Sequence, residues 1–158
     1  VDGEDGHPQV VDLGFVGEPA EVNAKLLKQL LDQGVTPIIA PIACGRKQGE
    51  VYSVNADTAA GAVAEALGAS RLLLLTDVQG VLDAESSLIT DITPKSAKSL
   101  IAEGIIKGGM IPKLQTAVKA VNNGVGGAAI VDGRVPHAIL KELFSEHGAG
   151  TLVAPDLV

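Results

Sequence analysis

The chain has 158 residues, of which 46% are apolar and 20% charged, and this composition is typical of one folded domain rather than a disordered segment. The formal net charge of -7 argues against nucleic-acid binding, and no apolar run is long enough to span a membrane. Aromatic residues make up only 2%, so the core must be built from aliphatic side chains. Residues 1–9, rich in glycine and acidic residues, predict a flexible end, and residues 10–158 predict a single lobe.

Strands and helices are expected to alternate along that lobe. Asn23 can cap a helix that Gly34 ends, and Thr93-Pro94 is a typical helix start. Residues 72–75, four consecutive leucines, form an apolar run too short to be a helix alone, which favours a buried strand. Strands are predicted at residues 10–16, 35–43, 50–54, 71–76, 128–131 and 151–153, and helices at 23–33, 56–67, 93–103, 109–124 and 136–144.

This alternation predicts an α/β fold with a mainly parallel sheet and helices on both faces. In such sheets ligands bind beyond the carboxyl ends of the strands. We therefore expect a functional site in the loops that follow Pro41, Leu75 and Val131.

The cysteine and histidine residues do not predict thiol or metal chemistry. Cys44 is the only cysteine, so no internal disulfide can form, which fits a cytoplasmic protein, or a plastid protein if the source is a plant or alga. His7, His137 and His147 lie far apart and lack the spacing of metal ligands, so we expect no metal site built by the protein.

The first candidate segment follows the leucine-rich strand directly and reads Thr76-Asp77-Val78-Gln79-Gly80-Val81-Leu82. Asp77 lies where the carboxyl end of a strand would meet a ligand, and Gly80 allows a backbone turn close to a bound group. An ordinary turn with an Asx hydrogen bond is the alternative interpretation.

The second candidate segment is Gly108-Gly109-Met110-Ile111-Pro112-Lys113. Two glycines precede a predicted helix, so their N–H groups can point at phosphate, and Lys113 can reach the same charge from one turn into the helix. Met110 could line an apolar purine site or simply fill the core. The P-loop pattern and the dinucleotide-binding fingerprint are both absent.

Two further segments carry polar residues at predicted turns. Asn55 and Asp57 flank a helix start, where they could serve as an N-cap and an acidic first turn, or Asp57 could orient a lysine beside a transferring phosphoryl group. Asp132-Gly133 is a turn signal, after which Arg134 and His137 are expected at the surface or as capping groups.

Taken in order, these segments resemble the acetylglutamate kinases of the amino acid kinase family. The resemblance covers roughly residues 11–153, and it is carried by residues 13–17 (LGFVG), 54–57 (VNAD), 73–78 (LLLTDV), 80–82 (GVL), 108–113 (GGMIPK), 132–137 (DGRVPH) and 148–151 (GAGT). It implies a three-layer α/β/α sandwich in which residues 10–158 would be the nucleotide-binding lobe. Enzymes of this family phosphorylate the side-chain carboxylate of N-acetyl-L-glutamate with ATP, whose phosphates carry Mg²⁺, in arginine biosynthesis.

The resemblance also implies roles for individual residues. Lys113 would neutralise charge on the transferring phosphoryl group, and Asp57 would orient the catalytic lysines. Asn55 and Ser53 would contact the amino-acid substrate. The nucleotide would be bound by Thr76, Asp77, Val78, Gln79, Gly80, Val81, Leu82, Ile105, Ile106, Lys107, Gly108, Gly109 and Met110.

The sequence departs from the family pattern in three ways. The family's N-terminal half, with a glycine-rich phosphate loop, a second lysine and a substrate-binding arginine, is missing, and the opening Val1-Asp2-Gly3-Glu4 suggests a chain cut from something longer. We therefore expect the isolated chain to be inactive or very weak unless it meets an N-terminal lobe, and the expected protein partners are that lobe or further copies of the chain in a homo-oligomer. Relatives usually carry Asn in place of Ser53, and arginine-inhibited relatives carry Glu in place of His147, so feedback inhibition by arginine is an open question.

Two other functions remain open at this point. The chain could belong to another amino acid kinase, such as an aspartate, glutamate or carbamate kinase. It could also be a non-catalytic nucleotide-binding module that docks a nitrogen-signalling regulator of the PII type, for which the charged loop at residues 45–48 is a candidate contact. Neither nucleic acid nor a membrane is an expected partner.

Overall fold

The computed structural model describes residues 14–156. The predicted flexible end and the first part of the predicted strand at residues 10–16 lie outside that range. Within it the chain is α/β, as predicted, and its elements follow in the order β1 (Val16–Gly17), α1 (Ala24–Asp32), β2 (Ile42–Cys44), β3 (Val51–Val54), α2 (Ala56–Leu67), β4 (Leu72–Thr76), β5 (Asp91–Ile92), α3 (Pro94–Ala102), α4 (Met110–Asn122), β6 (Ala128–Asp132), α5 (Ala138–Phe144) and β7 (Gly150–Val153).

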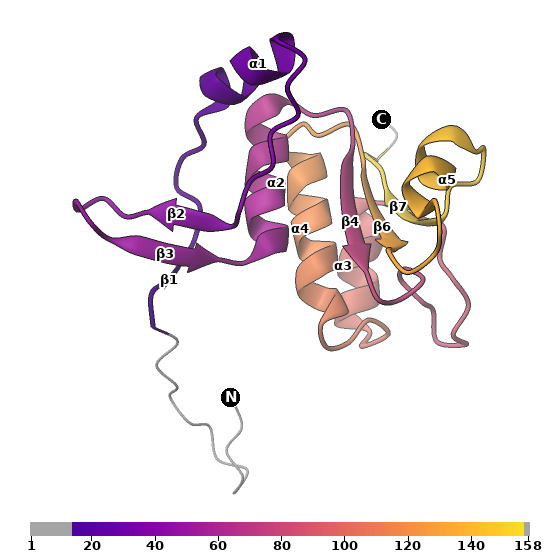
Figure 1. The fold of residues 1–158 in the computed structure, drawn as a ribbon. Helices are drawn as coiled ribbons and strands as arrows, with labels where there is room; N and C mark the ends of the chain where they lie inside the picture. Colours follow the sequence, from indigo (N-terminus) through magenta and orange to yellow (C-terminus); the bar gives the residue numbers. More distant parts are fainter. Residues whose placement is uncertain (1–13, 157–158) are drawn as a thin grey trace, which may run out of the picture.

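The larger of two sheets has four strands in the order β4-β6-β7-β5. Strand β4 runs parallel to β6, and β5 runs parallel to β7, whereas β6 and β7 are antiparallel (Figure 1). In the smaller sheet β1 is parallel and β2 antiparallel to the central strand β3. The parallel character predicted from the sequence is therefore present in three strand pairs and replaced by antiparallel pairing in two.

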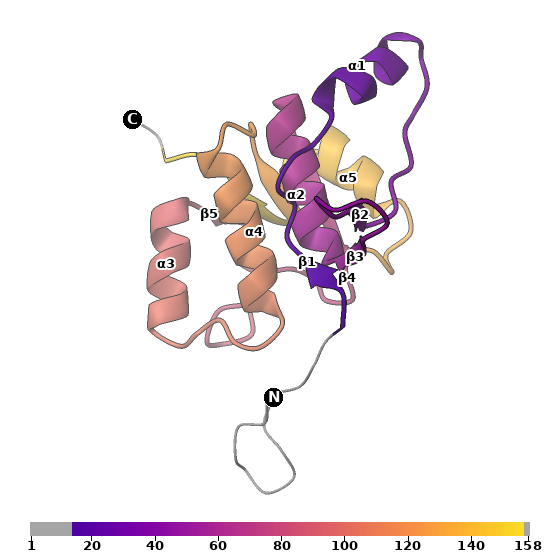
Figure 2. The same cartoon turned by 90° about the vertical axis from the view of Figure 1, so that its left-hand side faces the viewer.

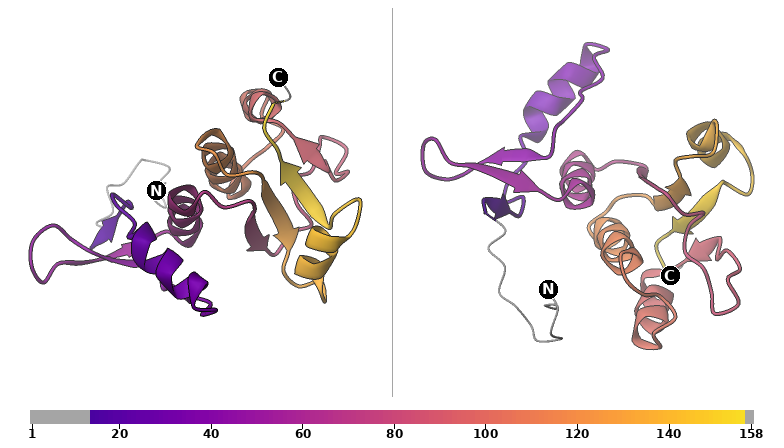
Figure 3. Two further views of the ribbon diagram at one scale, coloured as in Figure 1. Left: turned by 90° about the horizontal axis from the view of Figure 1, so that it is seen from above. Right: turned by 60° about the horizontal axis from the view of Figure 1, so that its bottom comes forward.

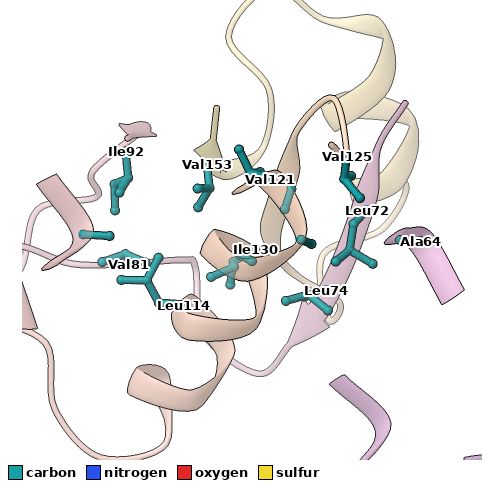
Figure 4. Packing of buried hydrophobic residues seen from close by; sticks show 14 of the residues in the cluster. Ala64, Leu72, Leu74, Val81, Ile92, Leu114, Val121, Val125, Ile130 and Val153 are labelled. Carbon is teal, nitrogen blue, oxygen red and sulfur yellow. The ribbon is translucent and has the colours of Figure 1, made fainter. Parts of the chain in front are cut away.

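Helices cover both faces of the four-stranded sheet, which makes three layers. Helices α2, α4 and α3 lie side by side on one face (Figure 2), and α5 packs on the other. The main core fills the space between the sheet and the three helices, and it is aliphatic as expected (Figure 4). Leu114, Ile130 and Val153 are fully buried there. All five residues of β6 are buried, which is expected of a central strand covered on both faces.

Capping residues explain where the helices begin and end. The Asn55 side chain accepts a hydrogen bond from the Thr58 N–H at the start of α2, and Gly68 ends this helix in a left-handed conformation. Thr93 and Ser96 form a capping box at the start of α3. These local signals are readable from the sequence, so the predicted and observed bounds of both helices agree within one residue.

The small sheet and α1 lie apart from the four-stranded sheet, on the other side of α2 (Figures 1 and 3). The sequence predicted a buried strand at residues 35–43, and this prediction is wrong. Only Ile42–Cys44 pairs as a strand, Val35 and Ile39 are exposed, and Ile38 is 99% exposed. Pro37 and Pro41 lack the N–H groups that a ladder needs, and no neighbouring strand among the described residues covers this segment.

Candidate functional site

The strand ends and helix starts that could form a site lie at one end of the molecule. Strands β4 and β6 both point toward the end where α2 and α4 begin (Figure 1). This geometry follows from the parallel pairing, in which each helix returns the chain to the same edge of the sheet. The carboxyl ends of these strands and the amino ends of these helices therefore face the same space, as expected for a ligand site in an α/β fold.

Lys113 and Asp57 form the central ion pair of this end. The Lys113 Nζ donates to Asp57 Oδ2 at 2.8 Å, and the two side chains are 22% and 24% exposed. They come from the first turns of α4 and α2, which pack closely because Gly61 presents no side chain to Thr116. The pair joins residues 56 positions apart. A lysine fixed by a carboxylate yet open to solvent can still meet a second anion.

Ser53 lies in β3 of the small sheet, and Asn55 directly precedes α2, the helix that carries Asp57. Ser53 is an exposed residue of β3, in register with Val16 and Ile42. Asn55 uses its side-chain oxygen as the N-cap of α2, so this oxygen is engaged with the Thr58 N–H and hydroxyl. The structure thus places the two predicted substrate residues and Asp57 along one short stretch, with Asn55 acting as a helix cap.

The segment after β4 divides into exposed and buried residues. Asp77, Val78 and Gln79 are exposed at the carboxyl edge of the sheet, and Asp77 Oδ1 accepts a hydrogen bond from the neighbouring Thr76 hydroxyl at 3.3 Å. Gly80 is buried, and the buried side chain of Val81 belongs to the core rather than to an open site. The exposed part of this segment is therefore the part that a ligand can reach.

The connection between α3 and α4 divides in the same way. Ile106 is buried in the core, and the N–H groups of Ile105 and Ile106 both donate to the Leu100 carbonyl. Lys107, Gly108 and Gly109 are exposed directly before α4. Met110, the first residue of α4, is half-buried against the core. In the segment after β4, Leu82 is partly exposed and forms an isolated antiparallel bridge with Leu88. Gly109 is the N-cap of α4 and offers no side-chain cap. In the first turn the Ile111 N–H donates to the Gly108 carbonyl and Pro112 has no N–H, so the main-chain donor that the start of the helix offers a ligand is the Met110 N–H.

The sequence analysis missed an ion pair at the end of β6. The Arg134 side chain donates two hydrogen bonds to Asp132, from Nε to Oδ1 at 2.9 Å and from Nη2 to Oδ2 at 2.8 Å, and the Arg134 main-chain N–H donates a third to Oδ1 at 3.0 Å. The Asp132 side chain is buried, and the Arg134 side chain is 66% exposed. Hydrogen bonds from the Arg134 side chain and backbone lower the pKa of Asp132 from 3.8 to about 2. The Asp132 hydrogen bond, with a smaller contribution from the Asp77 charge, raises the pKa of Arg134 above its ordinary value. The sequence signal that could have predicted this ion pair is the Asp-x-Arg spacing, which puts opposite charges two residues apart.

Among residues 14–156, no cluster of three or more His, Cys, Asp or Glu side chains is arranged to hold a metal ion. Within the same range, none of the helices is long and apolar enough to cross a membrane.

The sequence pattern of the amino acid kinase family matches residues 1–132, which is most of the chain. An acetylglutamate kinase from Rhizorhabdus wittichii is 57% identical over 145 residues, covering 92% of this chain and 48% of that protein. An acetylglutamate kinase from Brucella anthropi is 52% identical over 155 residues, covering 98% of this chain and 52% of that protein. The chain therefore spans about half the length of these curated relatives, and the resemblance predicted from its motifs is confirmed.

Solved structures share the fold. An N-acetylglutamate synthase from Neisseria gonorrhoeae, in complex with coenzyme A and L-arginine, has a TM-score of 0.84 and 26% identity, covering 91% of this chain and 33% of that one. The carbamate kinase from Giardia lamblia bound to AMP-PNP has a TM-score of 0.66 and 20% identity, covering 89% of this chain and 47% of that one. At 20% identity the second likeness supports the fold alone.

Proposed function

Because the chain belongs to the amino acid kinase family, we propose that residues 14–156 form the ATP-binding lobe of an enzyme that phosphorylates the side-chain carboxylate of N-acetyl-L-glutamate in arginine biosynthesis. The observation that carries the proposal is the Lys113–Asp57 ion pair at the amino ends of α4 and α2, on the side of the molecule where β4 and β6 end. This is a positive charge of fixed position beside helix N–H groups, which is what a phosphate chain requires.

In this proposal the nucleotide lies between two exposed segments. Asp77, Val78 and Gln79 flank it from the end of β4, and Lys107, Gly108 and Gly109 flank it from the start of α4. The buried residues Gly80, Val81 and Ile106 support these segments from the core, so that any contact they make with the nucleotide is through the backbone. At the start of α4 the Met110 N–H would face the phosphates.

Phosphoryl transfer depends on positioning and charge stabilisation more than on covalent chemistry by the protein. Bound ATP supplies the phosphoryl group and brings Mg²⁺ on its phosphates, an arrangement that suits Mg²⁺ because this ion usually keeps few protein ligands. Lys113 Nζ offsets the negative charge on the transferring group, and Asp57 keeps this ammonium in place. In this proposal Ser53 and Asn55, four and two residues before Asp57 in the sequence, contact the acceptor substrate.

We also propose that turnover needs residues beyond this lobe. The apolar side chains of Val35, Ile38 and Ile39 are exposed in an extended segment beside the small sheet, and Ile42 is exposed on β2. An exposed, extended segment with several β-branched apolar residues can pair with a further strand. The predicted partner is the N-terminal lobe, which would cover this face and complete the acceptor site.

Titration calorimetry of the chain with Mg·ADP and with a non-hydrolysable ATP analogue tests the nucleotide site. We expect saturable binding that is about tenfold weaker in Lys113→Ala, because a hydrogen bond to a charged phosphate is lost. Lys119→Ala is the matched control, since Lys119 lies on the last turn of the same helix. A well-folded chain that does not bind either nucleotide would refute the proposal.

A chimera with the N-terminal half of the Brucella anthropi relative tests the acceptor and the need for a second lobe. With acetylglutamate and Mg·ATP, the chimera is expected to turn over, and Lys113→Ala to lower kcat about a thousandfold. Aspartate, glutamate and carbamate are the comparison acceptors, and faster turnover of any of them would redirect the assignment. Full turnover by the isolated chain would contradict the need for a second lobe.

The regulator-binding alternative stays a separate prediction. The loop at residues 45–48 is exposed around Arg46 and Lys47 and joins β2 to β3 at the far tip of the small sheet (Figure 1). Retention of a PII-type protein by the chain, abolished by Arg46→Ala, would favour that function. A cytoplasmic setting and the homo-oligomer are likewise predictions.

A further inference from the structure

Strand β7 meets the loop that follows β4 through one fully buried hydroxyl group. Thr151 has 0% of its surface exposed. Its hydroxyl accepts a hydrogen bond from the Val81 N–H at 2.8 Å and donates one to the Ile89 carbonyl at 2.7 Å. One side chain therefore holds both arms of the loop at residues 81–89, which we call the 81–89 loop.

The hydroxyl takes the place of a main-chain hydrogen bond. In an antiparallel hydrogen-bonded pair, two facing residues exchange both N–H···O bonds. Here the Ile89 N–H donates to the Val81 carbonyl at 2.9 Å, whereas the reciprocal link runs from the Val81 N–H through the Thr151 hydroxyl to the Ile89 carbonyl. The loop arms are thus held open by one inserted group, and the loop is tied to β7 at the same point.

Gly80 makes the close approach possible. A Cβ atom on Gly80 would lie 2.6 Å from Thr151 Oγ1 and 2.8 Å from Leu88 Cδ1, and its backbone φ is +147°. The backbone at residue 80 therefore packs directly on the threonine side chain. The 81–89 loop has its own internal support, because Asp83 Oδ1 accepts from the N–H groups of Glu85 and Ser87.

The same contact fixes the downstream end of the exposed segment Asp77–Gln79. Its upstream end is fixed by β4, where Thr76 pairs with Asp132. Its downstream end is fixed where Gly80 and Val81 meet Thr151. A short segment anchored at both ends loses little conformational freedom when a ligand binds, which favours affinity.

We propose that Thr151 is a positioning residue for nucleotide binding, which acts by holding the 81–89 loop and thereby the segment Asp77–Gln79 in a binding-competent form. The inference rests on the proposed function, since it assumes that this segment contacts the nucleotide. Thr151 itself is buried behind the segment and acts through it. A hydroxyl is required at this position, because an aliphatic side chain would leave the buried Val81 N–H and the partly buried Ile89 carbonyl without the partner that Thr151 provides.

The experiment compares three variants of the chain by calorimetric titration with Mg·ADP, well below the unfolding transition of each. Thr151→Val keeps the shape and removes the hydroxyl, so we expect binding about tenfold weaker. Thr151→Ser keeps the hydroxyl, and its affinity should stay within about threefold of that of the parent chain. Val125→Ala is the stability control, because Val125 is a fully buried core residue that follows α4 and lies outside the 81–89 loop. Amide hydrogen exchange at Val81, faster in Thr151→Val alone, reports the loop directly.

The outcomes separate this inference from the proposed function. Unchanged nucleotide affinity in Thr151→Val, with normal binding by the parent chain, overturns the role of Thr151 and leaves the proposed function standing. Equal weakening in Val125→Ala also overturns it, because general destabilisation would then explain the effect. Failure of the parent chain to bind nucleotide overturns both. If Thr151→Val does not fold, Thr151→Ala and Thr151→Ser differ by the hydroxyl alone, and equal affinities in that pair overturn the inference.

Discussion

Replacing Gly80 by alanine tests how tightly the loop after β4 is packed. The new methyl group would lie 2.6 Å from Thr151 Oγ1 and 3.2 Å from the Thr151 main-chain nitrogen, so a flexible side chain cannot relieve the whole clash. The φ of +147° adds a conformation that L side chains rarely adopt. Backbone strain of this kind costs about 1–3 kcal/mol, and overpacking costs about the same again. The free energy of unfolding should therefore fall by roughly 2–6 kcal/mol.

Urea denaturation followed by circular dichroism measures this change, and thermal melting provides a second value. A loss near the centre of that range would lower Tm by about 8–16 °C in a domain of this size. Gly124→Ala is the matched control, because Gly124 also has a positive φ, +98°, but open space around its Cβ position. Both variants share the smaller entropy of an unfolded chain with alanine, so their difference isolates the packing contribution. If Gly80→Ala costs no more than Gly124→Ala, the close packing inferred at Thr151 is refuted.

Three further changes give measurable outcomes. Asp57→Asn should lower the free energy of unfolding by about 1 kcal/mol or less in urea denaturation, since the Lys113–Asp57 pair is partly solvated, and a larger loss would mean that the pair is mainly structural. Asp132 has a pKa of about 2 in the folded chain and 3.8 as its ordinary value, so its carboxylate stabilises the fold above about pH 4 and this contribution is lost as the pH falls toward 2. Melting curves of Asp132→Asn should therefore show a smaller fall in Tm between pH 5 and pH 2 than the parent chain, and an equal fall would contradict the assigned pairing with Arg134. Ile38→Ser should change the free energy of unfolding by less than about 0.5 kcal/mol while reducing self-association in analytical ultracentrifugation, and a loss above about 1 kcal/mol would mean that Ile38 is covered.

The parts of the fold that the sequence predicts are those with local signals. Asn55 and Thr93 are strong N-caps, and the four leucines before Thr76 read as a buried strand, so α2, α3 and β4 were predicted nearly at their observed bounds. Strand β5 has no such signal. It contains only two residues, and its existence depends on pairing with β7, which lies far away in sequence.

At residues 35–43 the local signal is present but the partner strand is not, and the prediction is wrong for that reason. The apolar pattern there is strong, but a pattern reports what a segment would bury if a partner were present. Nothing within the described residues pairs with Val35 or Ile38, and both stay exposed. Composition alone cannot say whether the partner surface belongs to the same lobe.

The sequence predicts some residues of the candidate site but not the residue that supports it from the core. The sequence singled out Lys113 and Asp57, and the structure brings these side chains together at 2.8 Å, while their catalytic roles stay predictions. Thr151 falls in the GAGT stretch that carries the resemblance, but the sequence indicates no role for its hydroxyl, because a threonine in a short end strand is ordinary. The importance of its hydroxyl depends on a backbone amide 70 residues away. Contacts of that range are set by topology, which a single sequence encodes only indirectly.

The position of β7 between β6 and β5 has a consequence for the order in which the lobe assembles during synthesis. The loop after β4 is made before the strand that holds it, which follows 70 residues later. At about 5–20 residues per second, the loop waits roughly 4–14 seconds on the ribosome for Thr151 to appear. Until then β5 has no inner neighbour, and the core lacks Val153. The candidate nucleotide site is thus one of the last parts of the nascent lobe to take its final shape.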